Sequence, residues 1–100
     1  MTYLIYAIDL PGMDQKREAL RQAHRDFLKS HGAKILASGA LLDEDGETII
    51  GGISLFDTNS RMEAERFAYE DPYSKAGIRA QTSIHRWRKR WWNGFFLGDA

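Results

Sequence analysis

Near the middle of the chain, the dipeptide Asp45-Gly46 separates two segments of strand-like composition, residues 34–42 and 48–56. An Asp-Gly pair is a strong short-range signal of a β-hairpin, because glycine readily adopts the positive φ angles that a tight hairpin turn requires. The sequence therefore predicts two adjacent antiparallel strands at the centre of the chain, and the flanking segments must fold around them.

The segment before this hairpin predicts one strand and one helix. Residues 3–10 are rich in aromatic and branched side chains and end at Pro11-Gly12, which is typical of a strand followed by a turn. A helix is then expected from Asp14, as its capping residue, to about residue 30, with Gly32 ending it.

The segment after the hairpin repeats this order with a second helix and a last strand. Residues 60–63 read Ser-Arg-Met-Glu, which has the form of a capping box, and Pro72 should end the helix near Asp71. Residues 71–78 are expected to form an irregular or helical turn, and the alternation in residues 82–92 predicts the last strand.

The resulting order, βαββαβ, predicts a ferredoxin-like α+β fold: a four-stranded antiparallel sheet with two helices on one face. Because 100 residues can close one core, we expect a single domain over residues 1–100, with about residues 93–100 as a C-terminal tail. The other sheet face, with Tyr6, Ile8, Ile50, Phe56 or their alternating neighbours, would lack cover, so a homodimer is expected.

Composition excludes several classes of protein. The chain has 14 Lys plus Arg and 14 Asp plus Glu, so the whole molecule has no net electrostatic attraction to nucleic acid. It has no cysteine, which excludes disulfides, a thiolate nucleophile and thiolate metal ligation. The apolar run at residues 3–10 contains Asp9 and is too short to span a bilayer, so a cytoplasmic protein without membrane attachment is expected.

One local cluster of positive charge must be considered separately as a possible nucleic-acid site. Four basic side chains follow His85 and are interleaved with or followed by tryptophans: Arg86, Arg88, Lys89 and Arg90, with Trp87, Trp91 and Trp92. This composition suits single-stranded nucleic acid, but residues 49–56 lack the stacking aromatics of an RNA-binding ferredoxin-like sheet. The favoured interpretation is a long edge strand whose tryptophans pack on a partner subunit, and nucleic acid is not an expected partner.

Two side chains could form a catalytic pair. His24 lies on the same helical stripe as Leu20, Phe27 and Leu28, so its ring should point toward the sheet. Asp71 continues the apolar stripe of the second helix and should also point inward. A shielded histidine with a carboxylate partner can transfer a proton near neutral pH, but an inward histidine can equally be a hydrogen-bonded core residue.

Short motifs in a consistent order resemble the YCII-related (YciI-like) family. They are Tyr3-Leu4-Ile5-Tyr6-Ala7, Arg21-Gln22-Ala23-His24, Ala37-Ser38-Gly39, and Asp71-Pro72-Tyr73 followed by Gly77. The resemblance covers nearly the whole chain. It implies a ferredoxin-like dimer with an active-site histidine-aspartate pair, which falls on His24 and Asp71. One branch of that family resembles chloroaromatic-pathway dehydrochlorinases.

Four residues near these motifs are candidates for binding a small-molecule substrate. Arg21 could hold an anionic group, or it could be a solvated helix charge. Ser38 and Gly39 would let a ligand approach the strand backbone closely, or would serve helix packing. Tyr73 could wall the pocket or donate a hydrogen bond, or it could be an interface aromatic.

No cofactor is indicated. His31 and His85 have no partner at a recognised zinc spacing, the acidic residues of the central turn are too few for a calcium loop, and no phosphate-binding glycine loop occurs. The sequence thus leaves two main hypotheses: a small-molecule enzyme of lyase-like or other proton-transfer type acting through His24 and Asp71 without metal or nucleotide, and a noncatalytic dimeric ligand-binding or accessory module. Single-stranded nucleic-acid binding through the basic aromatic tail ranks third.

Overall fold

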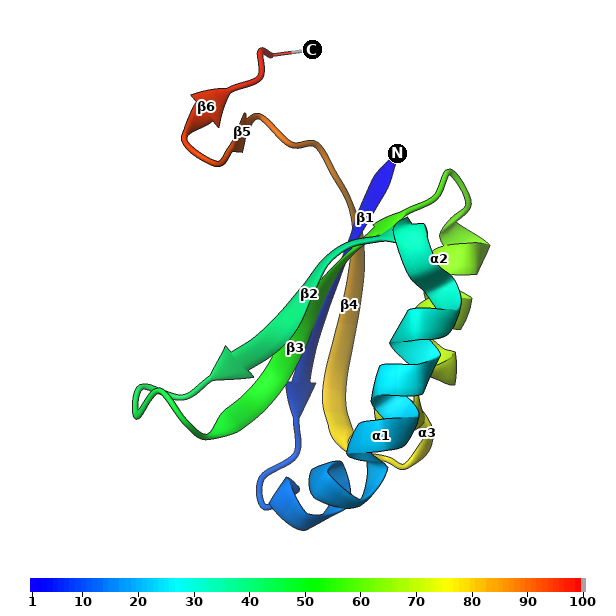
Figure 1. The fold of residues 1–100 in the computed structure, drawn as a ribbon, viewed down its shortest axis with the longest axis vertical. Coiled ribbons are helices and arrows are strands. Elements are labelled where there is room, and N and C mark those ends of the chain that lie inside the picture. Colours follow the sequence, from blue (N-terminus) through cyan, green and yellow to red (C-terminus); the bar gives the residue numbers. More distant parts are fainter. Residues whose placement is uncertain (100) are drawn as a thin grey trace.

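The structure is a computed structural model that describes residues 1–99 (Figure 1). Its elements, in chain order, are β1 (Thr2–Asp9), α1 (Asp14–His31), the 3-10 helix η1 (Gly32–Lys34), β2 (Ile35–Leu42), β3 (Ile49–Asp57), α2 (Arg61–Glu70), α3 (Pro72–Lys75), β4 (Arg79–Trp87), β5 (Trp91–Trp92) and β6 (Phe95–Phe96).

Four of the strands form one antiparallel sheet in the order β2-β3-β1-β4. The central strand β1 pairs with β3 on one side and with β4 on the other, and the helices cover one face of the sheet (Figure 1). This is the ferredoxin-like α+β arrangement that the order of elements predicted.

The core lies between the sheet and the helices. Tyr3 and Ile5 of β1 and Phe56 of β3 are buried against α2, where Phe67 stacks on Phe56 with ring centroids 4.4 Å apart. Burial of each such large apolar side chain contributes roughly 1.5–3 kcal/mol to stability, so this cluster holds the helices to the sheet. His31, at the end of α1, places its ring edge-on to Phe67 at 5.0 Å.

The opposite face of the sheet carries the alternate residues of the same strands. Because Tyr3 and Ile5 face the helices, Leu4 and Tyr6 point away from them, and the strand register places Leu55 and Ile53 beside these two residues. The face includes a band of buried and half-buried apolar side chains: Leu4, Tyr6, Ile8, Leu41, Ile53 and Leu55. Tyr6 and Ile8 were expected here, whereas Phe56 is in the core and its neighbour Leu55 takes its place.

Two predicted helix signals have different outcomes. The hydroxyl of Ser60 accepts a hydrogen bond from the backbone N–H of Glu63 at 3.2 Å, which confirms the capping residue of α2. Asp14 does not cap α1, because Met13 occupies the capping position and Asp14 is already the first helical residue. Its negative charge still lies in the first turn, where the helix dipole favours it.

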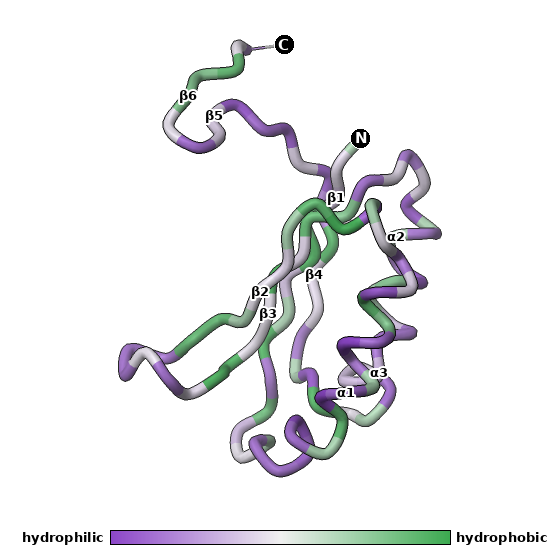
Figure 2. Tube along the Cα trace, in the orientation of Figure 1, coloured by the Kyte–Doolittle hydropathy of each residue, from purple (hydrophilic) through white to green (hydrophobic). Residues whose placement is uncertain are grey.

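The last strand was predicted at residues 82–92, and this prediction is wrong at both ends. β4 begins at Arg79 and stops at Trp87. Trp91–Trp92 pairs instead with Phe95–Phe96, because Asn93 and Gly94 adopt positive φ angles of 52° and 83° that reverse the chain. We call residues 88–99 the C-terminal arm; it projects beyond the sheet (Figure 1), and its link to β5 is hydrophilic (Figure 2).

No helix of the described residues has both the length and the apolar character that a bilayer-spanning segment requires.

Candidate functional site

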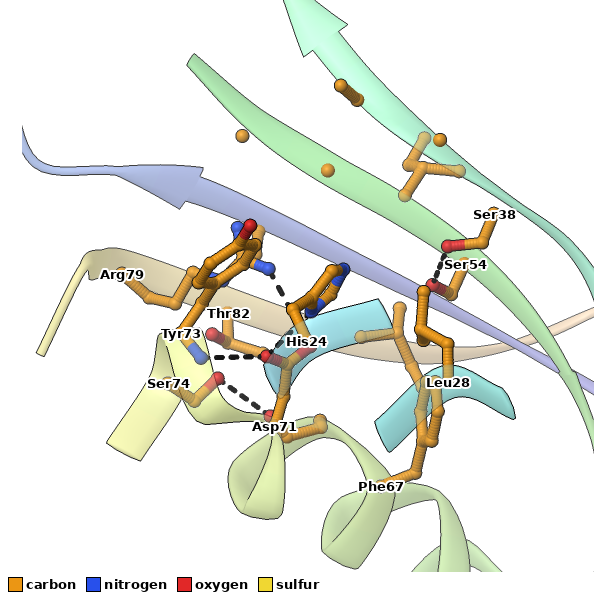
Figure 3. Close-up of a pocket in the computed structure, with 18 of the residues that line it drawn as sticks. His24, Leu28, Ser38, Ser54, Phe67, Asp71, Tyr73, Ser74, Arg79 and Thr82 are labelled. Atoms are coloured by element: carbon orange, nitrogen blue, oxygen red, sulfur yellow. Dashed lines mark hydrogen bonds and ion pairs between the residues drawn. The ribbon is translucent and has the colours of Figure 1, made fainter. Parts of the chain in front are cut away.

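His24 and Asp71 face each other between α1 and the start of α3. Nδ1 of His24 lies 3.1 Å from Oδ1 of Asp71, although the two residues are 47 positions apart in the chain. The two side chains are 21% and 11% exposed, so the pair is shielded from bulk water without being sealed. The inward directions predicted from the two helical stripes therefore bring these side chains into hydrogen-bonding contact (Figure 3).

The chain around Asp71 explains why its carboxylate points at the histidine. Asp71 ends α2 in an extended conformation, which the following Pro72 favours, and its Oδ1 accepts a hydrogen bond from the Tyr73 N–H at 2.8 Å. This contact caps α3 and holds the carboxylate in one orientation. The same oxygen atom of Asp71 therefore accepts from the local backbone and contacts the histidine.

Tyr73 covers one side of the imidazole. Its ring stacks on that of His24, with centroids 4.2 Å apart and planes inclined by 17°. The other surroundings of Tyr73 are cationic: the guanidinium carbon of Arg17 lies 4.5 Å from the ring centroid and that of Arg79 lies 5.5 Å away. Such contacts fix the ring, which in turn restricts how the histidine can turn.

Behind this layer lies a buried group of charges that sequence reasoning did not single out. Asp9, at the end of β1, accepts from Arg17 Nε at 2.6 Å and from Arg79 Nη1 at 2.9 Å, and its side chain is only 3% exposed. Arg79 also places Nη2 3.9 Å from Oδ2 of Asp71. Two arginines thus share one carboxylate, and one of them extends toward the histidine-aspartate pair.

Apart from Asp9, these groups line a pocket of about 500 Å³ between α1, α3 and the helix-facing side of the sheet. A volume of this size suits a small organic molecule. Its lining includes His24, Asp71, Tyr73, Arg17 and Arg79, together with Arg25 and Thr82, and strand residues on the far side (Figure 3).

Ser38 and Gly39 are on that far side. The hydroxyls of Ser38 and Ser54 are 2.9 Å apart on neighbouring strands, and both residues line the pocket. Gly52, paired with Ala7, also lines it, and a Cβ there would lie 3.3 Å from the carbonyl oxygen of Gly39. The pocket floor is therefore made of small residues that leave the strand backbone accessible.

Arg21 lies outside this pocket. Its guanidinium is 3.2 Å from Glu18 on the exposed side of α1, and it lines a neighbouring hollow of about 350 Å³. The arginine that reaches Tyr73 is Arg17, one helical turn earlier. The sequence shows that Arg17 and Arg21 are one helical turn apart, but it could not show which of these turns of α1 faces the sheet.

The sequence did not identify Arg79 and Asp9 as site residues, because each lies at the end of a strand, where the period-two pattern no longer shows which way a side chain points. The sequence feature that could have identified Asp9 is its charge near the end of the apolar strand segment of residues 3–10. Within residues 1–99, no cluster of three or more His, Asp or Glu side chains is arranged to hold a metal ion.

Comparison with known proteins gives a family and a structural neighbour. The YCII-related domain matches residues 1–88. An uncharacterized protein of Haemophilus influenzae is 30% identical over 96 residues, covering 89% of this chain and 98% of that protein.

One similar solved structure is that of 5-chloro-2-hydroxyhydroquinone dehydrochlorinase from Burkholderia phenoliruptrix AC1100, in complex with 2,5-dihydroxybenzoquinone. It superposes with a TM-score of 0.79 at 33% sequence identity, covering 88% of this chain and 94% of that chain. The domain match over residues 1–88 contains every residue that lines the pocket. The chain belongs to the YCII-related domain family.

Proposed function

We propose that this protein is a small-molecule enzyme that catalyses a proton-transfer reaction of the lyase or dehydrochlorinase-like type, with His24 as the base and Asp71 as the residue that orients it. The observation that carries this proposal is the 3.1 Å contact between His24 Nδ1 and Asp71 Oδ1 in the wall of a pocket of about 500 Å³.

The chemistry follows from which ring nitrogen Asp71 engages. A carboxylate accepts hydrogen bonds, so it favours the tautomer in which Nδ1 of His24 carries the proton. Nε2 then has an available lone pair and can accept a proton from a substrate. The carboxylate also stabilises the imidazolium that results, which lowers the cost of the transfer.

The arginines suggest the type of substrate. Proton removal leaves negative charge on the substrate, and guanidinium groups in a partly shielded pocket stabilise such charge. Arg25 lines the pocket, and Arg79 lies between Asp9 and Asp71. A planar hydroxylated ring that becomes an oxyanion would fit this wall, with the small residues of β2 and β3 beneath it.

In an elimination, His24 Nε2 takes a proton from the substrate, the electron pair left behind forms the new double bond, and the leaving group departs with the electrons of its bond to carbon. The proton on Nε2 then passes to water, which restores the histidine. The structural neighbour, named as a dehydrochlorinase and bound to 2,5-dihydroxybenzoquinone, supports this reaction class at 33% identity.

A noncatalytic ligand-binding module is the second candidate. Its support is the double use of Asp71, whose Oδ1 also accepts from the Tyr73 N–H and caps α3. A carboxylate needed for the fold would be retained even if His24 transferred no proton.

The decisive experiment compares two histidine variants. Wild type and His24→Asn are titrated with 2,5-dihydroxybenzoquinone by NMR and screened for chloride release from chlorinated hydroquinones. For an enzyme, His24→Asn lowers chloride release by about 100-fold or more, because general-base catalysis is worth roughly 10²–10⁴. Binding without turnover in the wild type would favour the ligand-binding module, and turnover that survives in His24→Asn would overturn the assignment.

His31→Asn is the matched control. The His31 ring lies against Phe27 and Phe67 in the core and its Nδ1 is 2.9 Å from the Phe27 carbonyl oxygen, so it is a structural histidine. We expect His31→Asn to lower the melting temperature while leaving the pocket chemistry intact, and His24→Asn to do the reverse.

We further propose that the protein is a homodimer formed through the open sheet face. The support is the apolar band on that face, in which Leu4, Tyr6, Ile8, Leu41 and Ile53 remain only half-buried in the described chain, beside the buried Leu55. Sedimentation equilibrium tests it: Tyr6→Lys should shift the wild-type dimer to monomer, and a monomeric wild type would refute it.

A further inference from the structure

The C-terminal arm exposes an unusual amount of apolar surface for its size. Five large apolar side chains of the arm are between 45% and 70% exposed: Trp91, Trp92, Phe95, Phe96 and Leu97. The register pairs Trp91 with Phe96 and Trp92 with Phe95, so both faces of the small ribbon carry aromatic rings. A hairpin of two two-residue strands is not stable alone in water, so the arm needs a surface to pack against.

The base of the arm is strongly basic. Arg86, Arg88, Lys89 and Arg90 lie within five positions, and the one acidic residue of the described arm, Asp99, is bound to Arg90 at 3.3 Å. Arg88 has no acidic side chain within ion-pair distance in the described chain. This part of the molecule therefore presents aromatic surface next to positive charge.

The opposite end of the sheet carries the complementary charge. The turn between β2 and β3 contains Asp43, Glu44, Asp45 and Glu47 and no basic residue. The two ends are opposite because β1 runs antiparallel to both β3 and β4: Thr2 pairs with Asp57 and with Trp87, far from Ile49 at the start of β3.

The arm and the acidic turn also lie on the same side of the sheet. In Figure 1 the helices cover one face, and both the arm and the β2–β3 turn lean away from them, toward the uncovered face. Figure 2 shows hydrophilic residues at the turn and at the link leading to β5. A molecule seated on the uncovered face would therefore meet the arm at one end and the acidic turn at the other.

A second copy of this chain can occupy that face in two limiting two-fold arrangements. If the strands of the two sheets run parallel, arm meets arm and acidic turn meets acidic turn, which places like charges together. If they run antiparallel, each basic arm meets the partner's acidic turn, so the same contact is made twice, as an isologous interface requires. Electrostatic complementarity selects between such arrangements.

We propose that the C-terminal arm is an exchange arm, which packs its aromatic hairpin and basic base on the acidic β2–β3 turn of a second copy in an antiparallel dimer. This inference rests on the homodimer proposed above and adds which ends of the two chains meet. It also gives the aromatic rings a partner surface, since the apolar residues Leu42 and Ile49 flank that turn and are exposed.

Disulfide trapping tests the arrangement directly, because the chain has no cysteine of its own. Glu44→Cys protein and Arg88→Cys protein, carrying tags of different mass, are mixed and oxidised. We expect a mixed disulfide between the two tagged chains and little of either like-with-like product. A dominant Arg88→Cys homodimer would indicate the parallel arrangement and overturn the proposal.

Charge reversal provides an independent test. Glu44→Lys or Arg88→Glu alone should weaken dimerisation by about fivefold or more, since each converts attraction into repulsion, and mixing the two variants should restore wild-type affinity to within about threefold. Lys29→Glu with Arg66→Glu, on the exposed helix surface, is the control and should have no effect. If the mixture of Glu44→Lys and Arg88→Glu proteins dimerises no more tightly than either variant alone, the proposed contact is overturned.

The outcomes separate this inference from the homodimer itself. Sedimentation that finds a monomer refutes the dimer and with it the exchange arm. A dimer without the mixed disulfide refutes the exchange arm alone. Binding of labelled single-stranded RNA that Arg88→Glu abolishes and Glu44→Lys leaves unchanged would assign the arm to nucleic acid and overturn the proposal.

Discussion

The rings of His24 and Tyr73 lie face to face, with centroids 4.2 Å apart and planes inclined by 17°. The tyrosine hydroxyl contributes little to this arrangement, because its hydrogen bond to the Arg17 carbonyl oxygen is long, at 3.5 Å. The aromatic face rather than the hydroxyl is therefore the feature that positions the imidazole.

Replacement of Tyr73 should separate these two contributions. Tyr73→Phe keeps the stacked face, so kcat and KM should stay within about twofold of wild type. Tyr73→Leu removes a contact worth about 0.5–1.5 kcal/mol, so kcat/KM should fall by up to about tenfold. Steady-state kinetics with a melting curve for each variant checks this; equal losses in both variants would instead implicate the hydroxyl.

Asp9 should be more important for stability than any carboxylate on the surface. Asp9→Asn would leave the buried guanidinium groups of Arg17 and Arg79 without their shared counter-charge, which typically costs about 3–5 kcal/mol. Urea unfolding measures the loss. Glu65→Gln, which breaks the exposed pair with Arg61 at 3.1 Å, is the control and should cost about 1 kcal/mol or less. Similar midpoints for Asp9→Asn and Glu65→Gln would contradict this account.

Two glycines of the sheet should respond differently to alanine. A Cβ at Gly51 would lie 2.1 Å from the carbonyl oxygen of Ala7, so Gly51→Ala must displace the β1–β3 backbone and should cost about 1–3 kcal/mol or more. A Cβ at Gly39 meets nothing within 4 Å, so Gly39→Ala should leave the unfolding midpoint nearly unchanged. Chemical denaturation of both variants decides, and a stable Gly51→Ala protein would show that the strands can separate more easily than the structure implies.

The acidic turn gives a prediction about pH. The pKa of Asp45 is lowered, first by the Thr48 hydroxyl and then by the backbone N–H groups of Glu47 and Thr48, all of which donate to its carboxylate. A lowered folded-state pKa contributes stability that is present above the unfolded pKa and is lost as the pH falls through the folded pKa.

Thr48→Val removes the hydroxyl that donates to the Asp45 carboxylate and should therefore raise the pKa of Asp45 toward its ordinary value. Carbon-13 NMR of the Asp45 carboxyl during an acid titration measures this directly. Glu44→Gln, in the same turn but without a hydrogen bond to Asp45, should leave the Asp45 titration close to that of wild type. An unshifted titration in Thr48→Val would show that the backbone donors alone stabilise the carboxylate.

The order of elements could be predicted from the sequence because its signals are local. Asp45-Gly46, the Ser60 cap and the helical stripe through His24 each depend on residues a few positions apart, and each corresponds to a feature of the structure. The facing directions of His24 and Asp71 follow from the same periodicity, together with a family resemblance that covers both.

The buried group of charges beside the pocket could not be predicted in this way. Asp9, Arg17 and Arg79 come from the end of β1, the first turns of α1 and the start of β4, and they meet only when the sheet and helices are assembled. The end of β4 was misplaced for a related reason. The alternation of residues 82–92 continues past Trp87, but the sheet offers no further pairing there, since Trp87 pairs with Thr2, the first residue of β1.

The single oxygen of Asp71 that engages both His24 and the Tyr73 N–H has a practical consequence. Any event that changes the charge or position of the imidazole must redistribute electron density on that oxygen, and the Tyr73 amide proton is hydrogen-bonded to it. The amide resonance of Tyr73 is therefore a built-in spectroscopic reporter, through which ligand arrival at the histidine can be followed from the backbone without any label on the site.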